Sequence, residues 1–459
     1  MGQGTRRGTL RGGSTILAGG VLAAACAPQG APAGAPQGGA RRAAPYTVRV
    51  QVWGDVQDKP VYDNILEDFN AAHTDIKMEN DHLPQGQDYY QKFAANLAAG
   101  TSADLVYFQG WMWPEYAAKD ALQPLDDLAG RDKWTTPWPN DEAYDLQTRF
   151  RSKRYLSPSN TGTMLVYYAK EYFDKAGIAY PKEGWTYQEF QDLTVKLTRQ
   201  LDGRQVYGYE WNTGYNRQTP WLRMAGGLEW DRIAEPRKAL WTAASVVDAL
   251  QYQLYDAPYK LGVSPQQAQL AADPSYNRIQ FGGTAMKMEG PWFLPQMWGP
   301  QARREGGTQY DVQLLPTGRS GKKVHLNLIE GQTLLKSSKD RDAAWEVMKW
   351  IAGEQGQQRI AEGGRMCNVP DTIRRLWLPQ TRQKYNVANA DAFLKAVETG
   401  TISTVGPVTV SVLDRDAAVA TTLNEIRDGK ATAKDAMERL QPKIQQVLDT
   451  YWATQPASK

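Results

Sequence analysis

Cysteine and histidine are scarce in this sequence. Its 459 residues include two cysteines, Cys26 and Cys367, and three histidines. Two cysteines cannot build a disulfide framework, and His73, His82 and His325 are not spaced as metal ligands. The sequence also lacks a G-x-S-x-G elbow, a P-loop and a C-x-x-C motif. We therefore expect no metal and no cofactor, and we expect Cys367 to be a buried thiol.

Neither sign of charge is in excess. The chain has 53 Lys and Arg against 50 Asp and Glu, a net charge of +3. This balance excludes nucleic acid or an anionic membrane as the main partner. A composition of 41% hydrophobic and 22% charged residues excludes disorder for most of the chain. The length exceeds one typical domain, so two or three lobes are expected.

Phenylalanine is rare beside the other aromatic residues. There are 9 Phe, 16 Trp and 23 Tyr. Most aromatic rings in the chain therefore have a polar group, and such rings suit surfaces and polar ligands as well as cores. The composition therefore favours surfaces and polar ligands, with a Trp-rich core as the alternative.

Long hydrophobic runs are also missing, and the N-terminus has only a short one. A basic stretch with two adjacent arginines (5–11) precedes an uncharged stretch (16–25) that is too short to span a bilayer. Residues 1–26 are thus a secretory signal, similar to a twin-arginine signal fused to a lipobox, whose Cys26 would receive lipid. Residues 27–45, rich in Ala, Gly, Pro and Gln, predict a flexible tether. We expect an exported, membrane-anchored lipoprotein, either periplasmic or at the cell surface.

The body of the chain predicts an α/β fold. TVRVQVW (47–53) alternates as a strand, residues 61–73 and 89–100 have helical periodicity, and DLVYF (104–108) is a second strand. Strand, helix, helix and strand with short connections indicate a parallel sheet. Later, Thr186 and Glu189 form a capping box at a helix start. A long helical region is expected from about 221 to 270.

Several segments together resemble one family, the extracellular solute-binding proteins (family 1) of ABC importers, which includes the maltose-binding protein. They occur in the order of that family and extend over nearly the whole mature chain. The segments are ALQPLDDL (121–128), LVYYAKEYFDKAGI (165–178), GWTYQEF (184–190), GGTAMKMEGPW (282–292), LLPTG (314–318), SSKDRDAAWEVMKWI (337–351) and GRMCNVP (364–370).

The resemblance implies a type II periplasmic-binding-protein fold. Two α/β lobes, each a mainly parallel sheet flanked by helices and discontinuous in sequence, would hold a ligand in the cleft between them. We expect the chain to cross between the lobes near residues 163–166, 311–315 and 385–389. The predicted lobes are 46–163 with 316–386 (N-lobe) and 164–315 with 387–459 (C-lobe).

Four strand ends combine a tryptophan with an acid or an amide. In open α/β sheets, ligands bind beyond the carboxyl ends of the strands. Flat rings suit the C–H faces of a sugar, and charged groups strengthen hydrogen bonds to its hydroxyls. The candidate ligand-binding residues at these ends are Trp53 and Asp55; Gln109 and Trp111; Trp211, Asn212 and Trp221; and Glu289, Gly290 and Trp292.

The resemblance places the tryptophan of the GPW turn, Trp292, in the cleft, with Glu289 as a hydroxyl acceptor. Asp55 and Glu289 could instead cap helices. Three further candidates are Asn160, which could also serve the hinge, Arg365, which could form a surface salt bridge, and Asp414, which stands where the maltose-binding member has an aromatic ring. We expect Trp298 to pack rather than to bind.

The resemblance implies a non-enzymatic receptor that captures a mono- or oligosaccharide by hinge closure and delivers it to the membrane permease. It would act as a monomer, with the membrane contacted only through the lipid. A phosphorylated polyol such as a glycerol phosphodiester is the alternative ligand, and Arg217, Arg365 and Arg415 are then the residues expected to bind it. A secreted carbohydrate-active enzyme is a second alternative, which would need two suitably spaced carboxyl groups.

Overall fold

The computed structural model describes residues 45–54, 58–83, 87–135, 142–233, 235–297, 309–399, 402–403 and 412–454; it leaves out the side chains of 87, 142–143, 145, 402–403 and 412–416. The predicted signal, Cys26, nearly all of the predicted tether, Asp55 and Trp298 lie outside this part of the chain. Residues 44–459 form one compact unit. Within the described residues, no helix has the length and apolar character needed to cross a membrane.

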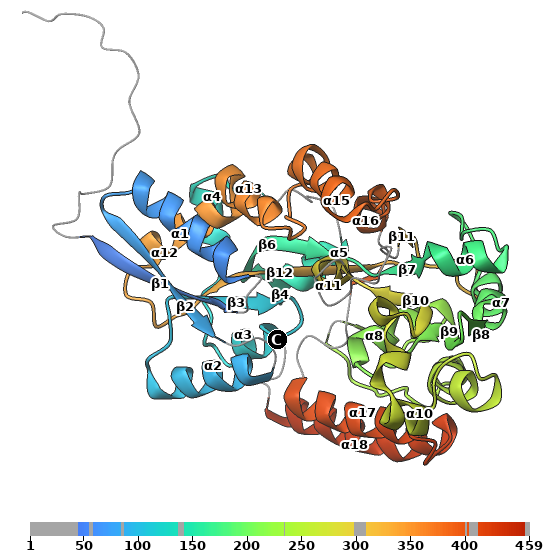
Figure 1. Cartoon of the computed structure of the whole chain (residues 1–459). Helices are drawn as coiled ribbons and strands as arrows, with labels where there is room; N and C mark the ends of the chain where they lie inside the picture. Colours follow the sequence, from blue (N-terminus) through green and yellow to red (C-terminus); the bar gives the residue numbers. More distant parts are fainter. Residues whose placement is uncertain are drawn as a thin grey trace, which may run out of the picture. The chain divides into compact units, whose positions relative to one another are not determined.

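The first sheet has six strands in the order β13-β12-β3-β1-β2, with β6 also paired to β12; all of them except β13 are labelled in Figure 1. β1 is parallel to β2 and β3, whereas β12 is antiparallel to β3 and β6. The strands are β1 Tyr46–Trp53, β2 Ile76–Leu83, β3 Leu105–Gln109, β6 Leu156–Gly162, β12 Leu326–Leu334 and β13 Ile402–Ser403.

Helix α1 (Lys59–Ala72) shows why the chain folds onto this sheet. Its buried residues Val61, Ile65 and Phe69 recur every four positions, so that one face of the helix is apolar. α1 packs beside α13 (Glu354–Glu362), and α12 (Arg341–Ala352) contacts β1 (Figure 1). The two predicted helices 61–73 and 89–100 are confirmed, but the strand β2 lies between them.

The second sheet has the order β11-β7-β10-β9-β8. Its strands are β7 Leu165–Ala169, β8 Arg199–Leu201, β9 Arg204–Glu210, β10 Thr284–Glu289 and β11 Tyr310–Gln313. Only β9 and β10 pair in parallel; the pairs β10–β7, β11–β7 and β9–β8 are antiparallel. The mixed α/β class is confirmed, whereas the prediction of mainly parallel strands is wrong for this sheet.

The helices near the second sheet are shorter than predicted. The capping box of Thr186 and Glu189 is present at the start of α7 (Tyr187–Leu197). The predicted helical region 221–270 is interrupted after α8 (Tyr215–Met224), where Gly226 has a left-handed backbone. Helix then resumes as α9 (Ala244–Leu250), a π-helix (Gln251–Lys260) and α10 (Gln267–Ala272).

The remaining elements connect or cover the sheets. They are α2 Gln87–Ala99, α3 Pro114–Ala118, α4 Asp126–Arg131, α5 Glu142–Thr148, β4 Arg149–Phe150, β5 Lys153–Arg154, α6 Lys170–Ala176, α11 Leu294–Met297, α14 Pro370–Thr372, α15 Leu378–Tyr385, α16 Asp391–Glu398, α17 Val412–Arg427 and α18 Ala433–Thr454; short 3-10 helices span Pro274–Asn277, Ile279–Phe281 and Pro291–Phe293, and a π-helix spans Ile373–Trp377.

The chain passes between the two sheets at two points. β6 ends at Gly162 in the first sheet and β7 begins at Leu165 in the second. β11 of the second sheet is followed by β12 of the first. After α15, Asn389 donates to Asp311 Oδ1 at 2.9 Å and to the Val312 carbonyl at 3.0 Å. β13, which lies within the predicted C-lobe range 387–459, pairs with the first sheet through β12.

Candidate functional site

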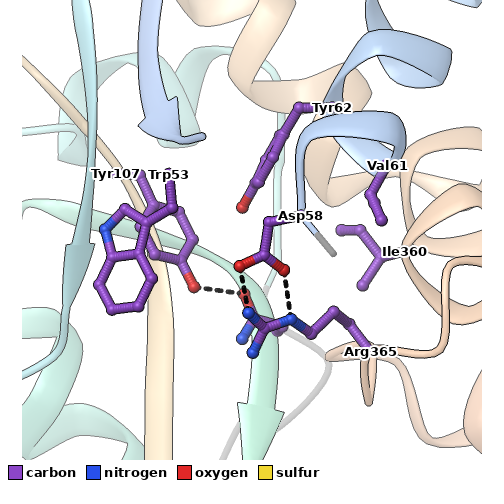
Figure 2. A pocket seen from close by; sticks show the side chains of 8 residues that line it. Trp53, Asp58, Val61, Tyr62, Tyr107, Ile360 and Arg365 are labelled. Atoms are coloured by element: carbon purple, nitrogen blue, oxygen red, sulfur yellow. Dashed lines mark hydrogen bonds and ion pairs between the residues drawn. The ribbon is translucent and has the colours of Figure 1, made fainter. Parts of the chain in front are cut away.

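A small pocket lies at the end of β1, beside the first turn of α1. It is lined by Trp53, Asp58, Val61, Tyr62, Tyr107, Asn160, Ile360 and Arg365. Figure 2 shows the guanidinium of Arg365 facing the carboxylate of Asp58, where Nε donates to Oδ1 at 2.5 Å and Nη2 pairs with Oδ2. Burial disfavours the charge of Arg365, but the adjacent Asp58 carboxylate raises its pKa above the ordinary value. Arg365 is therefore a fixed, partly buried cation.

Two residues that line this pocket, Tyr107 and Asn160, are hydrogen-bonded to each other and to Glu330. The Tyr107 hydroxyl lies 2.5 Å from Glu330 Oε2 and 2.9 Å from Asn160 Oδ1, and Asn160 Nδ2 donates to Glu330 Oε2 at 2.7 Å. Burial, followed by the charge of Glu330, raises the pKa of Tyr107 well above its ordinary value. The hydroxyl thus stays protonated and can donate to either oxygen.

Aromatic rings surround these polar groups. The Tyr107 ring meets Trp53 edge to face at 5.6 Å and Tyr62 at 6.0 Å between centroids. Such pairs fix ring orientation beyond simple area burial. The pocket therefore combines a rigid apolar wall with an amide, a carboxylate and a guanidinium.

A second pocket joins the first sheet to the turn after β10. Asn160 and Arg365 line this pocket as well as the first one, together with Glu330, Gly162, Pro291 and Trp292. The Trp292 ring packs on Gly162, where a Cβ would lie 3.0 Å from its Cζ3. Side chains connected to both sheets thus meet around this pocket.

Glu289 holds the Trp292 ring in place. Its Oε1 accepts from Trp292 Nε1 at 2.9 Å and from the Gly290 backbone N–H at 3.1 Å, and it pairs with Arg217 Nη2 at 2.8 Å. A Cβ on Gly290 would lie 2.2 Å from the ring, so this fold-back requires glycine. The sequence predicts a hydroxyl acceptor at Glu289; in the structure this carboxylate, 4% exposed, is occupied by protein donors.

A buried ion pair lies behind this turn. Lys287 Nζ is 2.5 Å from Glu210 Oε1 and 3.9 Å from Glu289 Oε2. Glu210 Oε2 also accepts from the backbone N–H of Ile279 at 2.7 Å. Because breaking a buried pair leaves an uncompensated charge, this arrangement fixes the ends of β9 and β10 relative to each other.

Several predicted residues do not line these pockets. Trp221, on α8, is 1% exposed and packs against Phe190 and Tyr209 at 4.9 and 5.3 Å, so its assignment to the site is corrected to the core. Trp211 is also buried, and its Nε1 donates to the Pro265 carbonyl at 3.0 Å.

Three other candidates are engaged or enclosed elsewhere. Asn212 Oδ1 accepts from the Gly214 N–H at 2.8 Å, and Gln109 Oε1 accepts from the Tyr90 hydroxyl at 3.2 Å. Trp111 is buried in the core at 6% exposure. The structure therefore brings together Trp53, Asn160, Arg365 and Trp292, with Glu289 and Gly290 behind the Trp292 ring.

Two assignments rest on side chains outside the described ones. Asp414 and Arg415 lie in α17, but nothing of their side chains is described. Asp55 falls in the gap before α1. Cys367, by contrast, is a buried free thiol as predicted, and burial raises its pKa to about 12.

Sequence reasoning missed Asp58, Tyr62, Tyr107 and Glu330. Glu330 had a usable signal, because it is the single charged residue of LNLIEGQTL, a strand that is otherwise uncharged. Asp58 directly precedes α1 and is buried, but the sequence does not show that its partner is Arg365, 307 positions away.

The pockets are small in this conformation. Each has a volume of ≈ 10 Å³, about the space of one water molecule. A sugar ring or any ligand of similar size can enter only if the walls move apart. Among the described residues, no group of His, Cys, Asp and Glu side chains is arranged to hold a metal ion.

Comparison with solved structures gives the same architecture. An ABC substrate-binding protein of Listeria monocytogenes, in complex with cycloalternan, matches with a TM-score of 0.75 at 19% identity, covering 88% of this chain and 99% of that one. The sugar-binding protein MalE of Xanthomonas citri matches with a TM-score of 0.72 at 20% identity, covering 88% and 98%. The GacH receptor of Streptomyces glaucescens, solved unliganded and with acarbose, matches with 0.70 at 18%, covering 89% and 99%.

Sequence comparison identifies the family. A Brucella abortus protein named only as a binding protein is 22% identical over 336 residues, which are 72% of this chain and 76% of the relative. The profile of the bacterial extracellular solute-binding proteins matches residues 53–358, more than half of the chain. The chain therefore belongs to the bacterial extracellular solute-binding protein family.

Proposed function

We propose that this protein is the substrate-binding component of an ABC importer and captures a neutral mono- or oligosaccharide between its two sheets. Trp292 supplies a flat face for the sugar ring, and Asn160, Glu330 and Arg365 supply hydrogen bonds to its hydroxyls. The protein binds and releases its ligand without cleaving it. Delivery to the transmembrane subunits of the permease follows from this role.

One observation carries the proposal. The Trp292 ring shares a pocket with an amide, a carboxylate and a guanidinium, and these groups come from segments attached to different sheets. A pyranose has C–H faces and a rim of hydroxyls, which require this combination of ring and charged hydrogen-bonding groups. Carbohydrates occupy two of the similar structures, as cycloalternan and acarbose, which supports the same ligand class here.

The charge at the site favours a neutral sugar over a phosphorylated polyol. Arg365 is paired with Asp58, and Arg217 is paired with Glu289. A phosphate group would need basic side chains whose charge is not already neutralised by neighbouring carboxylates. The positive charges of these two arginines are already neutralised by carboxylates, so the arginines can donate hydrogen bonds to a neutral sugar but attract a phosphate only weakly.

Export and anchoring complete the proposed function. The family is extracellular by its description, and residues 1–26 have the composition of a secretory signal. We infer that lipid on Cys26 anchors the protein through the tether 27–45. The protein would then act as a monomer close to its permease, in the periplasm or at the cell surface.

Thermal denaturation in the presence of a sugar panel tests the ligand class. A ligand that binds only the folded state stabilises it by about 2.7 kcal/mol at a concentration of 100 times Kd. We expect at least one neutral sugar to raise Tm, and Trp292→Ala to abolish that rise while the variant still folds. Trp452→Ala is the matched control, because its Nε1 donates to the Pro236 carbonyl and it lines neither pocket.

The outcomes separate the alternatives. If Trp292→Ala keeps the full Tm increase, Trp292 does not contact the ligand. If glycerol phosphodiesters raise Tm and neutral sugars do not, the phosphorylated ligand is correct. Incubation of the protein with oligosaccharides, followed by chromatography of the products, tests for cleavage; turnover would overturn the binding function.

A further inference from the structure

A third and much larger pocket lies next to the site. Its volume is ≈ 360 Å³, against ≈ 10 Å³ for each of the two pockets described above. It lies between the start of α1, the ends of α13 and α15, and Pro295 of α11. We refer to it as the outer pocket. Its volume falls in the range of small-molecule sites, ≈ 300–1,000 Å³.

The outer pocket shares a lining residue with the candidate site. Val61 lines both the outer pocket and the pocket that holds the Arg365–Asp58 pair. Asn160 and Arg365 then line both inner pockets. Shared lining residues therefore link the pocket at Trp292 to the pocket at the Arg365–Asp58 pair, and that pocket to the outer pocket.

Both sheets contribute to the outer pocket. Pro60 and Asn64 belong to α1, which packs on β2 of the first sheet, whereas Pro295 follows β10 of the second sheet. A movement that separates the walls of the inner pockets would also change the width of the outer pocket. A ligand that extends from one to the other would contact segments connected to both sheets.

The walls of the outer pocket suit a neutral sugar. Pro60 and Pro295 offer apolar surfaces for C–H groups. Asn64 and Lys384 are exposed donors, and the Lys384 ammonium lies 5.3 Å from the centroid of the Tyr385 ring. Glu362 also lines the pocket, and its carboxylate is paired with Arg359 at 3.0 Å.

We propose that the outer pocket is a second sugar subsite, so that the preferred ligand is an oligosaccharide with one ring at Trp292 and the next in the outer pocket. The inference rests on the proposed sugar-binding function. It specifies an oligosaccharide as the preferred ligand, because a monosaccharide would occupy only the inner pockets near Trp292. Asn64 and Lys384 bind the second ring.

Isothermal titration calorimetry with matched saccharide series tests the subsite. The probes are glucose with maltose and maltotriose, glucose with cellobiose and cellotriose, and xylose with xylobiose and xylotriose. In the wild-type protein we expect the disaccharide of the preferred series to bind at least tenfold more tightly than its monosaccharide.

Two variants then address the outer pocket alone. Asn64→Trp, at an exposed position of α1, fills the pocket and is expected to remove the gain from the second ring while the affinity for the monosaccharide stays within twofold. Lys384→Ala should reduce the gain by about fivefold. Glu67→Trp and Gln383→Ala are the matched controls, because both positions are exposed on the same helices and do not line the pocket.

The results distinguish the subsite from the function on which it rests. If no saccharide binds the wild-type protein, the proposed function fails. If saccharides bind but the disaccharide has no advantage over its monosaccharide, the second subsite is overturned. A disaccharide advantage that survives Asn64→Trp also overturns it, because the second ring then lies elsewhere.

Discussion

The indole of Trp292 donates a hydrogen bond to the carboxylate of Glu289, and Arg217 forms an ion pair with that carboxylate. Glu289 Oε1 accepts from Trp292 Nε1 at 2.9 Å, while Arg217 pairs with Glu289 at 2.8 Å and lies 5.5 Å from the centroid of the Trp292 ring. Arg217 thus acts on the ring twice, through the carboxylate and through a cation–π contact. Its role is to position the ring rather than to bind sugar itself.

Arg217→Met should weaken both the fold and the binding site. Loss of the charged hydrogen bond to Glu289 is expected to lower the free energy of unfolding by about 2 kcal/mol. Loss of the cation–π contact, about 1 kcal/mol, should weaken sugar binding about fivefold. Urea denaturation and calorimetry measure the two effects. Arg319→Met is the control, because Arg319 lies 4.9 Å from the Tyr187 ring, outside both inner pockets; equal losses of affinity in both variants would contradict the positioning role.

For single residues, the sequence indicated which residue types belong to the site better than it indicated which of those residues lie there. Trp292 and Trp221 both follow a strand and both stand near polar residues. Trp292 lies in a short turn beyond β10, whereas Trp221 lies inside α8 and packs against Phe190 and Tyr209. Which face of a helix is buried depends on tertiary packing, so local composition alone could not separate the two.

Among the elements, strands β12 and β6 form a β-bulge beside the site, next to the charged residue Glu330. Glu330 pairs with Asn160, but the next residue, Gly331, pairs with Pro158, so that Ser159 is the extra residue of β6. A bulge bends its strand and redirects side chains. Here the redirected pair is Asn160 and Glu330, which are joined by the hydrogen bond at 2.7 Å.

Gly331→Ala should disrupt this bulge. A Cβ at Gly331 would lie 2.1 Å from the Ser157 carbonyl oxygen, a backbone atom that cannot rotate away. We expect the free energy of unfolding to fall by about 2–3 kcal/mol, as measured by urea denaturation. Gly130→Ala is the control, because a Cβ there meets nothing within 4 Å and the helical site favours alanine. Equal stability of the two variants would show that the bulge tolerates a side chain.

The order of most elements could be predicted from sequence, but strand pairing could not. Helix α1 has three apolar residues on one face and is predicted correctly. The strand β2, IKMENDHL, was missed because it lies at the edge of its sheet and only Ile76, Met78 and Leu83 are buried. The antiparallel pairing of the second sheet depends on contacts between distant segments, such as β7 with β11, which local periodicity does not encode.

For the whole molecule, the family resemblance supplied what periodicity could not. It implied two sheets with the site between them, and the profile match over residues 53–358 confirms the family. The predicted lobe boundaries remain a prediction, with β13 paired to the first sheet. The width of the site could not be predicted from the sequence, because it depends on how closely its two walls approach each other. Trp292 rests on Gly162 here, and this contact must open before a sugar can enter.

The stability of the whole molecule should depend on pH through one buried histidine. His325 lies in the connection between β11 and β12 and is 1% exposed. Burial, followed by the charge of Lys323, lowers its pKa to about 4 from the ordinary 6.5. Between these values the unfolded state binds a proton that the folded state does not, so the stabilisation is complete above pH 6.5 and is lost as the pH falls toward 4.

Acidification from pH 7.5 to 4.5 should therefore reduce the free energy of unfolding by about 2 kcal/mol through His325 alone. Carboxylates with lowered pKa, such as Asp68 hydrogen-bonded to Arg359, begin to lose their contribution below about pH 5 and lose most of it below about pH 4. The histidine therefore dominates the upper part of the pH range. Urea denaturation at pH 7.5, 5.5 and 4.5 measures its contribution, and His325→Gln should flatten the curve over that range because glutamine cannot take up the proton. A variant that keeps the wild-type slope would assign the loss to other groups.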